Sequence, residues 1–438
     1  MGTMKSRKKI LGVSLSLILI NMAAIMERAD ENLLPSVYKE VSQAFNVGLA
    51  DLGYLTFVRN FVQGLTSPLA GILVIHYDRP TVLAMGTVFW ALSTAAVGVS
   101  RHFMQVAFWR AINGIGLAIV IPALQSFVAD SYREGLRGTG FGMLSLVGSL
   151  GGIGGGVVAT VMAGHEYWGV PGWRVAFIMM ATLSILIGFL VFIFVIDPRS
   201  HAFSDAFDRN VLMEKRKVSK SIWRESWTAM KVVTKLHTFF SPPSGFDHNA
   251  SAALLSLFAV GCSAGALFGG VIADRMSHLY PYSGRVMCAQ FSAFMGIPFS
   301  WFLLTVIPQS VHSWFTFAAT LLFMGLTISW CGAAVNAPVF AEVVPPEHRT
   351  MIYAFHRACE VSFSSFAAPL VGILSEKMYG YDPKSVHPDS GSAQEAFALS
   401  RGLLAMMAVP FGLCCLFYSP LYFVFKRDRD NVRLGSSK

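Results

Sequence analysis

The chain has 438 residues, of which 54% are hydrophobic and 13% are charged, and its mean hydropathy is +0.54. A soluble protein of this size needs far more charge to cover its surface, so the composition excludes a soluble globular protein and indicates a polytopic membrane protein. The net charge of +9 is explained by Lys and Arg in cytoplasmic loops, and no basic patch with interleaved aromatics indicates a nucleic-acid partner.

The N-terminal residues MGTMKSRKKI are basic and run into an apolar segment without a clear small-residue cleavage site. We therefore expect an uncleaved first helix rather than a signal peptide. All six cysteines fall in apolar runs of the second half. They are expected to be small buried side chains rather than a disulfide framework or a metal cluster.

A bilayer core of about 30 Å requires about 20 apolar residues per helix. Segments that meet this requirement lie near 10–34, 52–75, 81–99, 104–129, 139–163 and 174–196 in the first half. A second series lies near 250–272, 286–307, 313–341, 351–375 and 400–425. The sequence therefore predicts an all-α membrane protein with 11 clear transmembrane helices.

The connecting loops alternate between rich and poor in Lys and Arg, which places both termini in the cytoplasm. The basic positions are Lys5, Arg7, Lys8, Lys9, Arg79, Arg133, Arg137, Arg275, Arg285, Arg349, Lys426 and Arg427. An odd number of crossings cannot put both termini on one side of the membrane, whereas twelve crossings can. One crossing is therefore unaccounted for, between residues 197 and 249.

Residues 197–249 begin with a basic linker and continue with Trp223, Trp227 and Met230 at helical spacing. Basic residues lie on the other faces of the same predicted helix. This is the pattern of an interfacial helix rather than a spanning one. Ser241-Pro242-Pro243 then ends this helix. We predict that the seventh of an expected 12 helices is missing or truncated here.

The predicted organisation has five parts. They are a cytoplasmic N-terminus (1–9), a six-helix bundle (10–196), a linker with the degenerate seventh helix (197–249), a second helical bundle (250–425) and a cytoplasmic tail (426–438).

An internal repeat supports two related halves. Asp130 and Arg137 are seven residues apart, as are Glu342 and Arg349, and the two pairs are offset by 212 residues. Each pair would lie at the cytoplasmic end of the fourth helix of its half.

Several stretches resemble motifs of the major facilitator superfamily. The stretch from Gly270 to Arg275, GVIADR, is similar to the family's G-x-x-x-D-R loop, and the stretch from Arg110 to Gly116 is similar to its R-x-x-x-G-x-G helix. The first-half counterpart of the loop, GILVIHYDRPTVL, departs from the pattern at Ile75 and His76. This resemblance implies two pseudo-symmetric helical bundles with a solute path between them.

Within that family, Asn21, the Glu27-Arg28 pair and Leu33-Leu34-Pro35 resemble Spinster-like and plant-type members. Those relatives tend to place a Glu after the Gly-x-Gly of the fourth helix, where this chain has Leu117. This departure argues against proton coupling by the route that the resemblance implies.

Ionisable side chains at membrane depth are costly, so they should face a partner or a water-filled cavity. The candidates for substrate binding or ion coupling are Glu27, Arg28, Arg59, Arg110, Asn113, His356, Arg357 and Glu360. Arginines outnumber the deep acids, which suggests an anionic group on the substrate. The alternatives are structural ion pairs, of Glu27 with Arg59 or Arg110 and of Arg357 with Glu360. His356 is a candidate proton carrier or a packing group.

A second set of candidates lies in the cytoplasmic loops. The members of this gating motif are Gly71, Asp78, Arg79, Asp130, Arg137, Gly270, Asp274, Arg275, Glu342 and Arg349. The resemblance implies that its charge pairs form in one conformation and part in the other. A carboxylate that caps a neighbouring helix while accepting from Arg makes this physically reasonable. The alternative is solvated loop charges that follow the positive-inside bias.

No metalloprotease, nucleophile-elbow or zinc-ligand spacing is present, so we expect neither an enzyme nor a cofactor. The sequence predicts an alternating-access transporter, secondary active or facilitative, for a small organic solute. That solute is expected to be an anion or a lipid-like amphiphile with an anionic head, with protons as a candidate coupling ion. The alternative is a non-transporting truncated isoform or a regulatory membrane protein, which the 226–249 region favours.

Overall fold

The computed structural model describes residues 9–10, 13–47, 49–198, 248–308, 311–365 and 393–436. The chain divides into two compact units. Unit 1 comprises residues 1–133, 146–218 and 344–362, and unit 2 comprises residues 134–145, 219–343 and 363–438.

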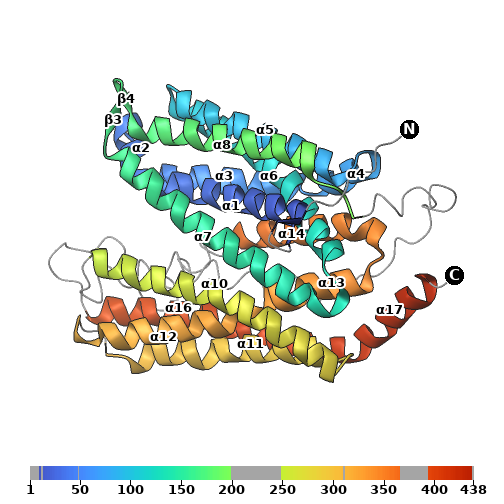
Figure 1. Ribbon diagram of the computed structural model, residues 1–438. Helices are drawn as coiled ribbons and strands as arrows, with labels where there is room; N and C mark the ends of the chain where they lie inside the picture. The colour runs from blue at the N-terminus through green and yellow to red at the C-terminus, as the bar shows by residue number, and fades with distance from the viewer. Residues whose placement is uncertain are drawn as a thin grey trace, which may run out of the picture. The chain divides into compact units, whose positions relative to one another are not determined.

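Unit 1 is built almost entirely from helices (Figure 1). They are α1 (Leu15–Ser36), α2 (Tyr38–Phe45), α3 (Leu49–Thr66), α4 (Pro68–His76), α5 (Arg79–Val99), α6 (Phe103–Ser131), most of α7 (Arg137–Ala163), α8 (Gly172–Phe194) and most of α14 (Arg349–Ser365). Two short antiparallel hairpins pair β1 (Lys9–Ile10) with β2 (Val13–Ser14) and β3 (Glu166–Tyr167) with β4 (Val170–Pro171).

Helix α5 packs closely against both α8 and α6, while α3 packs on α6 and α1 packs on α8. Glycines allow α5 and α6 to approach each other. A Cβ at Gly116 would lie 2.7 Å from the Trp90 Cβ, and one at Gly86 would lie 2.6 Å from a methyl carbon of Val120. Small residues permit this kind of close crossing between membrane helices.

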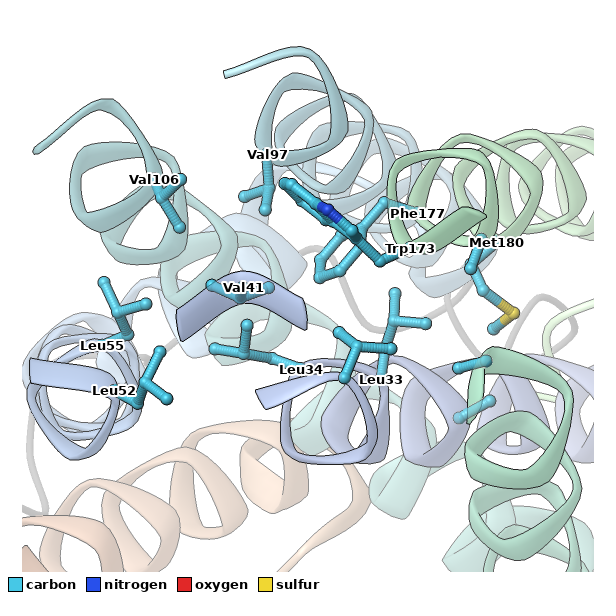
Figure 2. Close-up of a cluster of buried hydrophobic side chains, with 14 of the residues drawn as sticks. Leu33, Leu34, Val41, Leu52, Leu55, Val97, Val106, Trp173, Phe177 and Met180 are labelled. Atoms are coloured by element: carbon cyan, nitrogen blue, oxygen red, sulfur yellow. The ribbon is translucent and has the colours of Figure 1, made fainter. Parts of the chain in front are cut away.

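An apolar cluster fastens the short helix α2 to unit 1 (Figure 2). Val41 of α2 packs among Leu33 and Leu34 of α1 and Trp173 and Phe177 of α8, all of which are buried. This cluster packs residues near the ends of α1, α3, α6 and α8 around α2.

Unit 2 contains the first turns of α7 and a second set of helices. They are η1 (Glu134–Leu136), α10 (His248–Leu279), α11 (Gly284–Trp301) with a π-helical turn (Phe302–Val306), η4 (Val311–Ser313), α12 (Trp314–Ile328) with a π-helical turn (Cys331–Asn336), α13 (Ala337–Val343), α16 (Ala393–Tyr418) and α17 (Leu421–Ser436). The short turn η6 (Pro346–His348) precedes α14. In unit 2, α10 packs on α12 and α11 packs on α16.

The helices are more broken than their hydropathy alone predicts. The predicted segment 52–75 is divided into α3 and α4, which meet at a 46° bend before Pro68. The predicted segment 313–341 is interrupted by the π-helical turn, and α16 and α17 meet at 49° around Pro420. Helix α17 also continues through most of the predicted tail.

Six described helices are long and apolar enough to cross a membrane, or up to eight if each bent pair is one span. Helix α1 is not among them because Glu27, Arg28, Asp30 and Glu31 all lie within it. The predicted linker and degenerate seventh helix fall outside the described residues over 199–247, as does the end of the predicted 351–375 helix after residue 365. The predictions of 11 clear helices and a missing seventh helix therefore stay predictions.

Candidate functional site

A buried polar network joins four helices of unit 1. Asp30 of α1 accepts a hydrogen bond of 2.6 Å from the Thr94 hydroxyl of α5 and one of 3.3 Å from the Asn113 amide of α6. The Asn113 carbonyl oxygen accepts from Arg59 Nε of α3 at 3.1 Å, and Arg59 Nη2 lies 4.0 Å from the Asp30 carboxylate. All four side chains are at least 98% buried. The Asp30 carboxylate therefore compensates the positive charge of Arg59 at a position that is shielded from water.

The backbone of α6 is shaped to bring Arg59 to Asn113. Gly114 follows Asn113, and a Cβ at that position would collide with the Arg59 carbonyl oxygen. The absence of a side chain at Gly114 lets α3 lie directly against α6, within hydrogen-bonding reach of Asn113.

A second charged group follows one face of α1. Arg28 Nη1 donates to Glu31 at 2.7 Å, and Arg28 Nε lies 3.5 Å from the Glu27 carboxylate. Glu27 is buried, whereas the Arg28 side chain is 46% exposed. Gly148 of α7 leaves room for the Arg28 side chain, since a Cβ there would lie 3.1 Å from Arg28 Cγ.

The candidates on α14 lie near this group. Arg357 Nη1 and Glu360 form an ion pair at 3.2 Å, three residues apart on the helix. His356, Arg357 and Glu360 are all half-buried. The charge of Arg357 acts on Glu27, and that of Arg28 acts on Glu360. The α1 and α14 candidates therefore form two separate ion-paired groups in unit 1, Arg28 with Glu27 and Glu31 and Arg357 with Glu360, whose charges act on one another.

Arg110 differs from the other arginines of unit 1. Its side chain is 99% buried in α6, and its Nε and Nη1 atoms have no hydrogen-bond partner among the described residues. The charges that act on it include the like charge of Arg59 and the carboxylates of Asp30 and Glu31. A buried guanidinium with two unmet donors is costly, so this position is suited to an added anion.

The structure revises the charge balance that the sequence suggested. Asp30 and Glu31 join Glu27 and Glu360, so four acids now face the four arginines at positions 28, 59, 110 and 357. Arginines therefore do not outnumber the acids in this region. Only Arg110, whose Nε and Nη1 atoms lack hydrogen-bond partners among the described residues, still favours an added anion. Glu27 pairs with Arg28, while Arg59 is held by Asp30 and Asn113.

The first-half loop candidates form a charge network in unit 1. Arg79, the first residue of α5, donates to Asp130 at 2.7 Å and to both carboxylate oxygens of Asp197. Asp130 also accepts from Arg349, the first residue of α14. The Thr350 hydroxyl lies 2.7 Å from that of Ser126. Asp130 thus links the end of α6 to the beginnings of α5 and α14.

The second-half candidates form a corresponding network in unit 2. Asp274 accepts from the backbone amides of Gly138 and Thr139 at 3.0 and 2.7 Å, at the N-terminus of α7. The Asp274 carboxylate also accepts from Arg285 at 2.8 Å, and Arg285 donates to Glu342 at 2.9 Å. A carboxylate is stabilised at a helix N-terminus by the helix dipole as well as by these donors.

Arg429 of α17 completes the unit 2 network. It donates to Glu134 at 2.5 Å and lies 3.4 Å from Glu342. Burial raises the pKa of the Glu342 carboxyl at the end of α13, and the charges of Arg285 and Arg429 oppose that rise. Arg137 donates to the Ala341 carbonyl at 3.2 Å.

The remaining loop candidates are two glycines at close helix contacts and two exposed charged residues. A Cβ at Gly71 would collide with Met351, and one at Gly270 would collide with the Gly138 carbonyl oxygen. Asp78 and Arg275 are exposed. The two glycines therefore permit equivalent close helix approaches, one in each unit.

Sequence reasoning missed several members of these networks. Asp30, Glu31 and Thr94 were not among the predicted site residues, nor were Asp197 and Arg429. The one available signal was the density of acids in α1, where Asp30 and Glu31 follow the Glu27-Arg28 pair in an otherwise apolar segment. Asp197 lies just beyond α8, and Arg429 lies in α17, beyond the predicted 400–425 helix, where loop charges are common.

Comparisons with known proteins agree with this architecture. Residues 20–241 match the model of the Major Facilitator Superfamily. Protein spinster of Drosophila melanogaster is 22% identical over 408 residues, which cover 88% of this chain and 65% of that protein. The chain thus spans about two thirds of that relative's length. The cis,cis-muconate transport protein of Acinetobacter baylyi is 25% identical over 179 residues, which cover 40% of this chain and 41% of that protein.

Among solved structures, the proton:xylose symporter XylE bound to 6-bromo-6-deoxy-D-glucose is similar with a TM-score of 0.66. The match covers 92% of this chain and 95% of that one at 13% identity. At 13% identity, this structural similarity shows that the two proteins share a fold.

Proposed function

The chain belongs to the Major Facilitator Superfamily, and we propose that it carries a small organic solute across a membrane by alternating access. It is an integral, multi-pass membrane protein of the Spinster-like kind. The transport assignment rests on the family, because members with this fold move small solutes between two helical bundles.

We propose further that the solute carries an anionic group. The observation behind this is Arg110, whose buried guanidinium has two donors that no described residue satisfies. A carboxylate or phosphate fits such a fork. The similarity to a muconate transport protein supports a carboxylate, whereas the similarity to a xylose symporter offers a neutral sugar as the contrasting substrate.

The remaining candidates have supporting roles in this proposal. The Glu27–Arg28 and Arg357–Glu360 ion pairs would be the charged groups that the solute or a coupling proton meets, with His356 as the candidate proton carrier. The two loop networks would form and part as access alternates, with both termini in the cytoplasm.

The first test of this function is uptake into proteoliposomes of purified full-length protein. Labelled cis,cis-muconate and labelled xylose serve as anionic and neutral probes. Arg110→Gln should lower muconate uptake by about tenfold or more, since a hydrogen bond to a charged group contributes about 1.5–3 kcal/mol. Arg101→Gln, an exposed arginine that precedes α6, is the matched control and should leave uptake unchanged.

Two outcomes would count against the proposal at different levels. Saturable xylose uptake without muconate uptake would refute the anionic substrate and leave the transporter assignment intact. Absence of exchange for every tested organic anion, in folded protein, would favour the non-transporting alternative. That alternative was motivated by residues 226–249, which lie outside the described residues up to 247.

A further inference from the structure

The direction of α17 is set by a bend that side chains of unit 2 hold in place. Helices α16 and α17 meet at 49° around Pro420. The side-chain amide of Gln290, in α11, donates to the Cys415 carbonyl at 3.2 Å and to the Ser419 hydroxyl at 3.1 Å. The Tyr422 hydroxyl donates to the Gln290 side-chain oxygen at 2.8 Å. Gln290 thus binds both sides of the bend.

One face of α17 packs on unit 2 and ends in a buried arginine. Leu421, Phe425 and Arg429 recur every four residues, so they share a helix face, and all three are buried. Leu421 and Phe425 belong to an apolar cluster with Val286 of α11 and Val339 of α13. Arginine is rarely buried unless it is paired, so the partners of Arg429 define what this face does.

Arg429 contacts three separate segments of unit 2. Its Nη2 donates to Glu134 of η1 at 2.5 Å, and its Nη1 donates to the carbonyl of Pro281, in the turn between α10 and α11. Its Nε lies 3.4 Å from the carboxylate of Glu342, in α13. The planar guanidinium carries five donors in a fixed arrangement, which suits it to join several acceptors at once. These three segments connect the helices that carry the second-half gating candidates.

Three carboxylates of this network share two arginines. Arg285 contacts Asp274 and Glu342, while Arg429 contacts Glu342 and Glu134. The Glu134 side chain is 40% exposed, so water can solvate its charge, whereas Glu342 is only 6% exposed. Loss of Arg429 would therefore be felt most by Glu342, because a buried charge that loses a partner is costly.

The charges around Glu342 indicate how that cost depends on pH. Burial raises the pKa of the Glu342 carboxyl, the charges of Arg285, Arg429 and Arg137 oppose that rise, and the charge of Glu134 adds to it. Removal of Arg429 would raise the pKa of Glu342 further. Since a raised pKa means that the packed arrangement favours the protonated form, uptake of a proton by Glu342 would relieve the cost as the pH falls.

Unit 1 has a counterpart of opposite charge. Arg79 binds Asp130 and Asp197, and Asp130 also binds Arg349, so that two acids face two arginines. Asp197 lies just beyond α8, as Arg429 lies beyond α16. Without Asp197, the two arginines would share one acid. In each unit, a residue that follows a long apolar helix thus supplies a charge that balances the network.

We propose that Arg429 of α17 is a positioning residue of the unit 2 gate. It holds η1 and the end of α13 in the arrangement in which Asp274 binds the start of α7, and it supplies the countercharge that Glu342 needs there. This rests on the proposed function, in which the network forms and parts as access alternates. The contacts of Arg429 named above all lie in unit 2, so it acts on the gate rather than on the solute candidates of unit 1.

Hydrogen exchange in the full-length protein tests this role without a substrate. The amides of Gly138 and Thr139 bind Asp274, so the peptide that contains them reports on the network. Arg429→Gln should speed their exchange several-fold, and Arg429→Lys should do so less because the charge is kept. The matched control is Arg427→Gln, whose side chain is 73% exposed and pairs with its neighbour in the chain, and it should leave exchange unchanged.

A second substitution separates charge from simple packing. Glu342→Gln in the Arg429→Gln background removes the carboxylate that has lost its partner, so it should reverse most of the excess exchange. Lower pH should reduce the excess in Arg429→Gln itself, after correction for the intrinsic exchange rate, because Glu342 takes up a proton. Loss of packing alone would respond to neither change.

Uptake of labelled cis,cis-muconate links the network to transport. Arg429→Gln should lower the maximal uptake rate several-fold with an unchanged KM, since the solute candidates lie in unit 1. If the wild type takes up neither probe, the proposed function fails, and the exchange measurements still decide the role of Arg429. Equal exchange in Arg429→Gln and Arg427→Gln, or an excess that neither Glu342→Gln nor acid reduces, would overturn the proposal.

Discussion

At the scale of single residues, the decisive feature is how each buried charge is compensated. Asp30 is shared by partners from three other helices, and Arg59 depends on it for its countercharge. Removal of one member of a buried ion pair is far more costly than replacement of both, because the remaining charge is left in a medium of low dielectric. Arg110 differs in that its Nε and Nη1 atoms have no hydrogen-bond partner among the described residues.

Asp30→Asn should therefore destabilise the protein by about 3 kcal/mol, since Arg59 would be left buried without its carboxylate. Unfolding in detergent, followed by heat or denaturant, measures this change. The control is Asp78→Asn, which removes an exposed carboxylate without a capping hydrogen bond and should change stability by no more than about 0.5 kcal/mol. Equal stability of the two variants would show that the four-helix network contributes little.

At the scale of helices, glycine positions decide which pairs can touch. Gly270 of α10 and Gly138 of α7 face each other, and a Cβ at Gly138 would lie 2.7 Å from the Gly270 carbonyl oxygen. This close approach places the Gly138 and Thr139 amides on the Asp274 carboxylate. Gly71 permits the equivalent approach of α4 to Met351 of α14.

Gly270→Ala should destabilise the protein by about 1–3 kcal/mol, because the added methyl group has no space between the two backbones. Gly154→Ala on α7 is the matched control, since a Cβ there meets nothing within 4 Å. That control should be neutral or stabilising by up to about 1 kcal/mol, through the better helix propensity of alanine. Thermal unfolding of both variants in one detergent compares them, and a Gly270→Ala variant as stable as the wild type would contradict the packing argument.

At the scale of the whole molecule, each unit carries the same arrangement at one end. An arginine at the start of a helix binds an acid at the end of the next hydrophobic stretch, as Arg79 binds Asp130 in unit 1 and Arg285 binds Glu342 in unit 2. The acids are the two that the sequence repeat aligned. The repeated geometry supports two structurally related halves.

The number of crossings can be tested through the two ends of the chain. An even number places both termini on one side of the membrane, whereas loss of the seventh helix alone would place them on opposite sides. The basic loops favour the cytoplasmic side for both termini, so epitope tags at both should be labelled only after permeabilisation of intact cells. That result would contradict the predicted loss of the seventh crossing. A C-terminal tag accessible without permeabilisation would show an odd number of crossings and would support the missing helix.

The sequence by itself was sufficient for the class, the family resemblance and most helix positions. Long apolar segments are local properties, because a bilayer demands about 20 such residues wherever a helix crosses. The loop motifs are local as well, so Gly270, Asp274 and the repeated acid–arginine spacing were found without a structure. The fold is accordingly that of the Major Facilitator Superfamily.

Only the tertiary structure decided which charges meet. Asp30 lies 29 residues from Arg59 and 83 from Asn113, and no spacing rule connects residues so far apart. The helix breaks at Pro68 and in the π-helical turns also depend on neighbours that satisfy the freed backbone groups. Burial and partnership are properties of packed helices, so the unmet donors of Arg110 became visible only once the helices were placed.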